Sequence, residues 1–582
     1  MSMLSSRIPK KPPRPPFLFV AAIDFGTTYS GYAFSSKDSW EIVRTNKWTG
    51  GNLMSEKAPT VVLLNPDQSF NSFGYTAENE YSELAKLPGK KYRDYYYFNN
   101  FKMKLHISKN VTDGSVVEDV IGKPMQAFLV FAHAIRELKK LLLAQLKNAI
   151  TGAKDEDVLF VLTVPAIWDE RAKLFMRKAA IKAGIHPNLL VVALEPEAAS
   201  VFCQTLPFNV EDIGQSQLAK PGVQYMVADL GGGTADLTVH RRTQNNKLQE
   251  LWRASGGPWG GKAVTDKFQR FVEEIVGGKV MKSFIDEEME DYLELLRDFE
   301  VKKRQVKINK PSITINIPVS INEVMKEHSA DKDFETAIKS SKYSSDLVFR
   351  RNKLTLNENL TMKLFEPIVR EIMKKMDDVF EHVSSEIPYI LLVGGFSECE
   401  IVRQRIKEHF ESKTVIAPHD SGLIVLKGAV YFGYLPEAIS IRCAPYTFGM
   451  QSWPPFDPRL HPSNKRVIIN GKVRCKDVFH KFVTIGDPIE PGCSKSQAFQ
   501  VLDTKQSFLE CVVYISEEDD PKFVDDCTPL ITLNIPLENF RNREIVEIEE
   551  TLVFGETELR ITAVDSKTGV EYTVSKELTT RY

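Results

Sequence analysis

Two segments far apart in the chain combine glycines, hydroxyls and carboxylates in the same order. Residues 229–236 have the sequence Asp-Leu-Gly-Gly-Gly-Thr-Ala-Asp, and residues 24–30 have the sequence Asp-Phe-Gly-Thr-Thr-Tyr-Ser. Because glycine has no Cβ, backbone N–H groups in such a turn can come close to an anion. The hydroxyl of Thr234 adds a donor, and the carboxylates of Asp229 and Asp236 could hold a hydrated cation. Taken alone, the segment 229–236 could also be a plain hairpin whose glycines supply only turn geometry.

The repetition of this pattern favours a ligand-binding turn over a plain hairpin. In both segments an apolar run precedes the aspartate, and a second apolar run follows the turn. Internal similarity of this kind predicts two related half-domains, each with a phosphate-binding hairpin. Two such hairpins facing one cleft would hold a polyphosphate from both sides.

Two further charged groups are candidates for catalysis. Lys102 and Lys104 close an aromatic, basic segment that begins at Tyr95. A lysine beside a phosphate cleft could neutralise the charge of a transferred phosphoryl group, although the spacing alone favours a solvated surface lysine. Glu195 directly follows the apolar run 189–194 and could orient a water molecule, or serve only as an acid at a helix N-terminus.

A third glycine-rich segment, Gly256–Ala263, nearly matches the phosphate-binding loop pattern. Ala263 stands where that pattern requires a serine or threonine, and Pro258 lacks an amide donor. The sequence gives no sign of a strand-to-helix context at this point. We therefore do not expect a phosphate-binding loop here.

The elements that position these residues alternate between strands and helices. Continuous apolar strands are expected at 158–165 and 189–194, with amphipathic helices over 124–149 and from Asp169 to Ala183. A further strand, 389–393, ends in Gly394 and Gly395 and leads into a helix. This rhythm predicts an α/β fold, in which ligands bind at the carboxyl ends of strands.

The bulk properties describe an ordinary globular protein of several domains. The chain has 582 residues, a net charge of −2 and seven scattered cysteines, which predicts a reducing, cytoplasmic environment without a disulfide framework. Nothing in the total charge points to nucleic acid, and no run is long enough to span a membrane. Residues 1–16 are basic and proline-rich; we expect a disordered leader, or else a ligand for an SH3-type domain.

After about residue 434 the long helical patterns stop. Short alternating segments follow between turn residues (482–485, 509–515, 531–535, 545–548 and 558–563). This pattern of short strands and turns predicts an all-β module, most simply a sandwich, with no helical region after it.

The combined motifs resemble the ATPase superfamily of actin, sugar kinases and the 70 kDa heat-shock chaperones. Residues 23–30 are similar to the chaperones' first phosphate motif, 229–236 to the second, and 393–397 to the adenosine motif; Thr163–Ala166, Arg171 and Glu195–Pro196 match the segment between them. The similarity is greatest to the divergent branch of heat shock 70 kDa proteins 12A and 12B. It implies a duplicated actin-like (ribonuclease H-like) ATPase domain in two lobes over 17–436, a linker at 437–443 and a smaller β-rich, substrate-binding-like domain at 444–582 without a helical lid.

The resemblance also implies roles for individual residues toward ATP or ADP and Mg²⁺. Asp24 and Asp229 would hold the water shell of Mg²⁺, Glu195 would lie near the attacking water, and Lys102 would be the catalytic lysine, with Lys104 as the rival. Catalytic roles fall on Lys102, Glu195, Asp229 and Thr234. The residues implied to contact the nucleotide are Asp24, Gly26, Thr27, Thr28, Tyr29, Gly231, Gly232, Gly233, Thr234, Gly261, Glu300, Lys303, Arg304, Gly394 and Gly395.

Several positions depart from the family pattern. Phe396–Glu398 stands where the family has an arginine that stacks on adenine, and Lys307 replaces a serine expected after Arg304. Lys262 and Ala263 replace an acidic pair, and the linker contains only two large apolar residues. The phosphate contacts are therefore expected to be intact, whereas base stacking and coupling between domains are altered.

Three functions follow as hypotheses. The first is a chaperone-like, weakly hydrolysing ATPase that binds protein or peptide clients and works with co-chaperones or exchange factors. The second is a nucleotide-sensing scaffold or signalling protein in which hydrolysis is incidental. The third, a sugar kinase, leaves the C-terminal β module unexplained.

Overall fold

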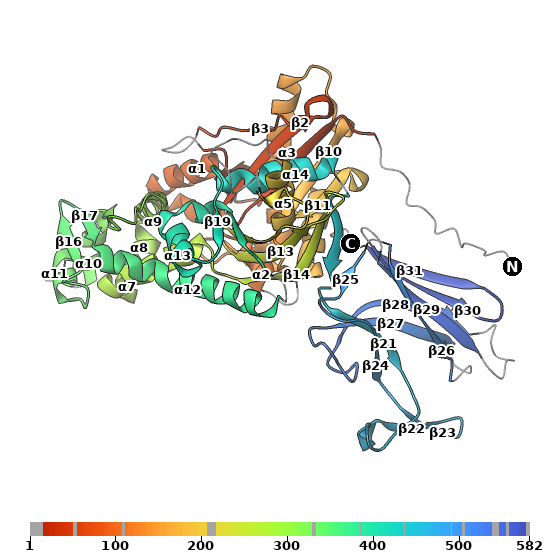
Figure 1. Cartoon of the computed structure of the whole chain (residues 1–582). Helices are drawn as coiled ribbons and strands as arrows, with labels where there is room; N and C mark the ends of the chain where they lie inside the picture. The colour runs from red at the N-terminus through yellow and green to blue at the C-terminus, as the bar shows by residue number, and fades with distance from the viewer. Residues whose placement is uncertain are drawn as a thin grey trace. The chain divides into compact units, whose positions relative to one another are not determined.

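The computed structural model describes residues 16–49, 55–107, 111–205, 217–328, 333–383, 386–435, 437–490, 492–502, 507–537, 546–554 and 558–577. These fall into two units, one of residues 1–237 with 255–436 and the other of 238–254 with 437–582. Both are shown in Figure 1. The predicted mixed α/β composition is confirmed. The leader predicted for residues 1–16 lies, apart from its last residue, outside the described residues.

The first unit contains a sheet with the strand order β11-β10-β1-β2-β3, in which β4 also pairs with β2. Strands β1, β10 and β11 are parallel, β2 is antiparallel to β1, and every residue of β1, β10 and β11 is buried. Such strands need apolar residues throughout because helices cover both faces of a parallel sheet. The bounds are β1 (Phe19–Phe25), β2 (Tyr29–Ser36), β3 (Arg44–Thr45), β4 (Ala58–Pro59), β10 (Val158–Val164) and β11 (Leu190–Leu194).

Four helices accompany this sheet: α3 (Ala127–Ala149), α4 (Glu170–Lys182), α5 (Glu195–Thr205) and α14 (Ser421–Tyr434). Asp169 caps α4 as predicted, because its carboxylate accepts a hydrogen bond from the N–H of Ala172 (2.8 Å). Helix α3 begins at Ala127 rather than at Pro124. Residues 124–126 instead form a short strand, β9 (Pro124–Gln126), which pairs with β8 (Val116–Glu118).

A second group of strands repeats this plan. β12 (Gln224–Leu230) lies between β18 (Tyr389–Val393) and β13 (Ala235–Arg242), and β18 pairs in turn with β19 (Thr414–Ile416). β12, β18 and β19 are parallel. Asp24 and Asp229 therefore both lie near the carboxyl ends of parallel strands, the position expected for ligand-binding residues.

Residues 255–382 are mainly helical. Residues 312–356, which the sequence left unorganised, form the antiparallel sheet β15-β17-β16 and two helices. Its hairpin turns at Arg351 and Asn352, both with positive φ (51° and 60°), so it lacks the glycine that usually marks such a turn. The bounds are α7 (Gly261–Val276), α8 (Gly278–Glu287), α9 (Met289–Arg304), β15 (Ile313–Asn316), α10 (Ser320–His328), α11 (Phe334–Ser340), β16 (Leu347–Arg350), β17 (Lys353–Leu356) and α12 (Glu358–His382).

The remaining elements of the first unit flank these layers. β5 (Val61–Leu64) pairs with β6 (Phe70–Phe73) and with β7 (Tyr96–Asn99). Helix α1 spans Tyr75–Lys86, α2 spans Met103–Ile107 and α13 spans Glu400–His409. Across both units, no helix of the described residues is long and apolar enough to cross a membrane.

The second unit is built from strands. One antiparallel sheet has the order β24-β21-β27-β28 and another the order β26-β29-β30-β31, and residues of both share one hydrophobic core. The predicted linker contains strand β20 (Ile439–Cys443), which pairs in parallel with β14 (Leu248–Gly257) and antiparallel with β25 (Pro488–Ile489). The other bounds are β21 (Thr447–Ser452), β22 (Arg466–Ile469), β23 (Lys472–Cys475), β24 (Val478–Val483), β26 (Ser494–Gln500), β27 (Phe508–Ser516), β28 (Thr528–Pro536), β29 (Glu547–Phe554), β30 (Glu558–Asp565) and β31 (Glu571–Glu577).

Candidate nucleotide-binding site

Both glycine turns line one cavity of about 260 Å³ in the first unit. Every residue that the sequence assigned to catalysis, nucleotide or metal lies in its wall, although these residues come from segments between Asp24 and Gly395. They are Asp24, Gly26, Thr27, Thr28, Tyr29, Lys102, Glu195, Asp229, Gly231, Gly232, Gly233, Thr234, Gly261, Glu300, Lys303, Arg304, Gly394 and Gly395.

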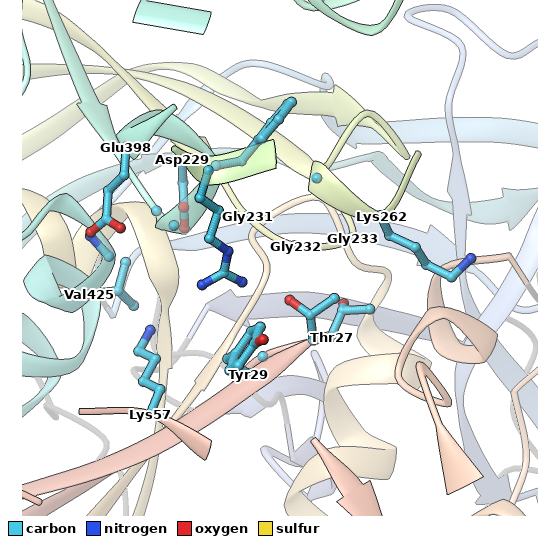
Figure 2. A pocket seen from close by; sticks show the side chains of 18 of the residues that line it. Thr27, Tyr29, Lys57, Asp229, Gly231, Gly232, Gly233, Lys262, Glu398 and Val425 are labelled. Atoms are coloured by element: carbon cyan, nitrogen blue, oxygen red, sulfur yellow. The ribbon is translucent and has the colours of Figure 1, made fainter. Parts of the chain in front are cut away.

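The two turns are in direct contact across the cavity. A Cβ at Gly232 would lie 2.0 Å from Thr28 Oγ1, and a Cβ at Gly233 would lie 2.4 Å from Thr27 Oγ1. Neither position can therefore carry a side chain unless the opposite turn moves. Figure 2 shows Thr27 and Tyr29 facing the turn formed by residues 231–233.

The segment after β14 supports the second turn from behind. The N–H groups of Gly260, Gly261 and Lys262 donate to the carbonyls of Gly233, Gly231 and Gly232 (3.2, 3.1 and 2.7 Å). The sequence analysis was wrong to find no strand-to-helix context here, because this loop joins β14 to α7. These amides are nevertheless already bonded to carbonyls and cannot form the donor cradle of a phosphate-binding loop.

Asp24 is held by two protein groups. Its Oδ1 accepts a hydrogen bond from Thr163 Oγ1 (2.9 Å), and its Oδ2 forms an ion pair with Lys57 Nζ (2.6 Å). Burial by itself would raise the pKa of Asp24, but the Lys57 amine, with smaller contributions from Lys102 and Thr163, holds that pKa below its usual value. Asp24 is therefore a carboxylate, ready to interact with a cation.

The other buried acids respond in the opposite direction. Burial raises the pKa of Asp229 and of Asp236 well above the usual value, and the neighbouring Glu195 adds to both shifts. Asp236 Oδ1 is fully buried and has no hydrogen-bond partner among the described residues. Asp229 and Asp236 therefore favour the protonated form in the absence of a further positive charge, and a cation bound beside them would favour their ionised form.

Lys102 and Lys104 have different environments. Lys102 is 2% exposed, and its Nζ lies 3.1 Å from Glu195 Oε1 and 5.0 Å from the centre of the Trp168 ring. Burial raises the pKa of Glu195, an effect that the Lys102 ammonium partly offsets. Lys104, two residues further along the chain, is exposed and does not line the cavity.

Lys57 is a site residue that the sequence analysis missed. It precedes β4 in a polar stretch with no motif of its own. The pairing of β4 with β2, in which Ala58 lies opposite Ser30, places it beside Asp24. Figure 2 shows its side chain extending into the cavity. The only signal in the sequence was a lysine directly before an apolar strand, which is too common to be informative.

Helix α9 supplies the charged cluster at the other end of the cavity. Lys303, 3% exposed, donates from Nζ to the carbonyl of Gly261 (2.7 Å) and forms an ion pair with Glu300. Arg304 also pairs with Glu300 (3.0 Å), and its guanidinium lies 4.4 Å from the centre of the Tyr29 ring. Burial opposes ionisation of Glu300, but the two cations outweigh it and keep the pKa of Glu300 low.

Residues 394–398 close the cavity beside this cluster. Gly394 has φ +84°, and a Cβ there would lie 2.3 Å from Asp229 Oδ1, so only glycine fits. Glu398 lines the cavity, and its Oε1 accepts a hydrogen bond from the N–H of Gly422 (2.9 Å). The position is therefore occupied by an anchored carboxylate and not by a cation that could stack on a base.

Comparison with known proteins agrees with this geometry. A family model described as "Domain of unknown function (DUF8340)" matches residues 219–418. Human heat shock 70 kDa protein 12B is 33% identical over 97% of this chain and 92% of its own length. Mouse heat shock 70 kDa protein 12A is 32% identical over 95% of this chain and 90% of its own length.

The relatives, with a cavity lined by both glycine turns, define an HSP70-like nucleotide-binding protein. More particularly, the chain belongs to the 70 kDa heat-shock protein family, in the divergent branch of proteins 12A and 12B. The resemblance stated from the motifs is thereby confirmed.

Proposed function

We propose that the protein binds Mg-ATP in this cavity, hydrolyses it slowly and couples its nucleotide state to a protein client. The observation that carries the nucleotide site is the contact between the two turns, in which Thr28 faces Gly232 and Thr27 faces Gly233 at distances that leave no room for a Cβ. Backbone donors and hydroxyls then approach the same point from both sides, as a polyphosphate requires.

The side chains present fit a magnesium ion that enters with the nucleotide. No group of three or more His, Cys, Asp or Glu in the described part of the chain could hold a metal by itself, which suits an ion whose other ligands are phosphate oxygens and water. Asp24 and Asp229 would hold its water shell, and the unpartnered Oδ1 of Asp236 is a further acceptor nearby. The bound ion would neutralise phosphate charge.

The chain's own residues would act on the terminal phosphate from the Lys102 side. The ammonium of Lys102 is buried and held by Glu195, so it would offer a positive charge already stripped of water. Glu195, whose pKa is raised by burial, would orient the attacking water, and Thr234 and the 231–233 amides would hold the phosphate. Hydrolysis would then depend on Lys102, whereas binding would depend mainly on the turns.

We also propose the finer architecture that this function needs. The two groups of parallel strands would be the duplicated halves of an actin-like (ribonuclease H-like) ATPase domain at 17–436, with nucleotide between its lobes. Residues 444–582 would be a β-sandwich client-binding domain, reached through 437–443. The setting would be the cytoplasm, with a role in stress response and with co-chaperones or exchange factors as partners.

A second candidate is a nucleotide-sensing scaffold in which hydrolysis is incidental. It is favoured by Glu398, which stands where a stacking arginine would strengthen base binding in a turnover cycle. In that case nucleotide binding alone would change the protein's affinity for a partner.

Single-turnover ATP hydrolysis separates these functions. We expect Lys102→Ala to keep ATP affinity within a few-fold and to lower hydrolysis at least 100-fold, while Lys104→Ala, the exposed neighbour, leaves both unchanged. Equal hydrolysis by wild type and Lys102→Ala would refute the ATPase. ATP-sensitive binding of an unfolded peptide tests the client, and no response to nucleotide would leave only the scaffold.

A further inference from the structure

The hairpin β22–β23 in the second unit has one protected edge and one open edge. Its turn consists of Asn470 and Gly471, both with positive φ (48° and 75°), which defines the two-residue turn that suits tight hairpins. It extends beyond the other labelled strands of this unit in Figure 1. Its edges therefore depend on local covering and not on a larger sheet.

The register shows which main-chain groups face outward. In a hairpin with this turn, Ile469 and Lys472 exchange hydrogen bonds, and the next pair, Ile468 and Val473, does not. On the β23 side, the outward carbonyl of Val473 accepts from the N–H of Phe456 (3.3 Å), and the outward N–H of Cys475 donates to Pro454 (2.9 Å). The segment before the hairpin thus covers the edge of β23.

The edge of β22 has no such cover. By the same alternation the N–H and C=O of Arg466 and Ile468 point away from β23. No other strand of the described part of the chain pairs with β22. The N–H of Arg466 donates to the carbonyl of Ser463 in the preceding turn, but no other backbone hydrogen bond among the described residues reaches 466–469 from outside the hairpin. An exposed edge with free donors and acceptors is a template for one more strand.

The side chains at this edge are apolar and exposed. Ile468 is 62% exposed, and its cross-strand neighbour Val473 is 37% exposed. The edge strand, Arg-Val-Ile-Ile, is rich in β-branched residues and has no proline. Such a strand is the kind that pairs with an extended chain.

The hairpin and the segment before it contain more basic than acidic residues. Residues 453–476 contain six basic residues and one acidic residue. Lys465 is paired with Asp477 and Asp525, and Arg459 with Asp457. Arg466 and Lys472 form no ion pair with any described residue, so their charges remain available to a partner.

We propose that the open edge of β22 binds an extended segment of a partner protein in which apolar and acidic side chains alternate. Main-chain hydrogen bonds to the N–H and C=O of Ile468 and to the C=O of Arg466 would add the segment as a third strand. Its apolar side chains would lie on the face of Ile468 and Val473, and its acids, on the opposite face, would pair with Lys472. A second copy of this chain fits less well, because two basic edges would repel each other. All these residues belong to the second unit, so the proposal does not rest on nucleotide binding.

The test uses the full chain and fluorescent ten-residue peptides of alternating valine and glutamate, with alternating valine and lysine as the control. We expect the glutamate peptide to bind at least tenfold more tightly than the lysine peptide. Ile468→Pro removes an outward N–H without removing a bond of the hairpin ladder, and should weaken binding at least tenfold, whereas Ile468→Thr, which keeps the N–H, should weaken it less.

Proline at position 468 could disrupt the hairpin itself, so a charge-reversal variant provides an independent test. Lys472→Glu should weaken binding of the glutamate peptide and strengthen binding of the lysine peptide. Binding that is unchanged in both variants, or equal for the two peptides, would overturn the proposal. Concentration-dependent self-association abolished by Ile468→Pro would overturn it too, in favour of an interface between copies. ATP affinity measured in the same variants keeps the outcome separate from that of the nucleotide site.

Discussion

Replacement of Lys57 tests how the proposed nucleotide site balances its charges. Lys57 Nζ lies 2.6 Å from Asp24 Oδ2, with the two side chains 19% and 7% exposed. A magnesium water shell held by Asp24 would have to displace this amine. The wild-type protein should therefore lose part of the affinity that magnesium would otherwise add to nucleotide binding, and Lys57→Met should recover it.

The structure sets the size of this effect. Two unit charges near contact distance interact by about 4 kcal/mol at an effective dielectric constant near 20. Lys57 is partly hydrated, and its ammonium would stay close to other acids after it leaves Asp24. We therefore expect a loss of about half of this interaction energy, roughly 2 kcal/mol, which corresponds to about 30-fold in affinity. The ratio of ATP affinity with magnesium to that with EDTA should thus rise about 30-fold in Lys57→Met.

The assay is fluorescence anisotropy of a labelled ATP analogue, with isothermal calorimetry as a check. Methionine keeps the length and apolar stem of lysine while removing its charge. Lys262→Met is the matched control, because Lys262 also lines the cavity but pairs with Asp266 instead. A magnesium-to-EDTA ratio in Lys57→Met within threefold of the wild-type value would refute the reasoning, as would the same rise in Lys262→Met.

Three other perturbations have definite expected outcomes. Gly232→Val puts a Cβ 2.0 Å from Thr28 Oγ1 and should abolish measurable ATP binding, while Gly114→Ala, whose nearest neighbour would be 3.8 Å away, should leave it unchanged; equal affinities would mean that the cavity is not the site. Glu398→Arg should raise ATP affinity about three- to tenfold by placing a cation where a base can stack, and a fall in affinity would count against this view of that position. Burial raises the pKa of Glu550 to about 7 from a usual 4.5. The folded state therefore keeps this proton to higher pH, so the stability that it contributes is complete below about pH 4.5 and is lost as the pH rises through 7. Glu550→Gln should remove on the order of 3 kcal/mol of pH dependence from the second unit; hydrogen exchange in β29, compared between variants at matched pH, measures it, and parallel pH slopes in the two proteins would rule it out.

Prediction from the sequence succeeded where a local pattern carries the information. A turn that must bring backbone amides toward a ligand needs glycine in any context, so residues 231–233 and Gly26 were visible without a structure. Buried parallel strands such as β1 and β10 are continuous apolar runs for the same local reason. Strand β26 was missed because most of its side chains are exposed, which removes the alternation on which strand prediction depends.

Residues 312–356 show the opposite case. Their strands β15, β16 and β17 have four residues each, and the hairpin turn lacks glycine. Which of their apolar residues face the core becomes clear only when the three strands are paired. Long-range pairing, and not intrinsic preference, decides such short strands.

What the sequence determined by itself was the set of residue types at the candidate site: two aspartate–glycine–threonine turns, a third glycine pair, and a lysine and a glutamate. Each of these is recognisable from the local sequence. What only the tertiary structure decided was which charges meet there. Packing buried Lys102 against Glu195 and left Lys104 exposed, although the two lysines are indistinguishable in the sequence. The pairing of β4 with β2 brought Lys57 to Asp24, because contacts between distant segments depend on how strands associate and not on the residues near them in the chain.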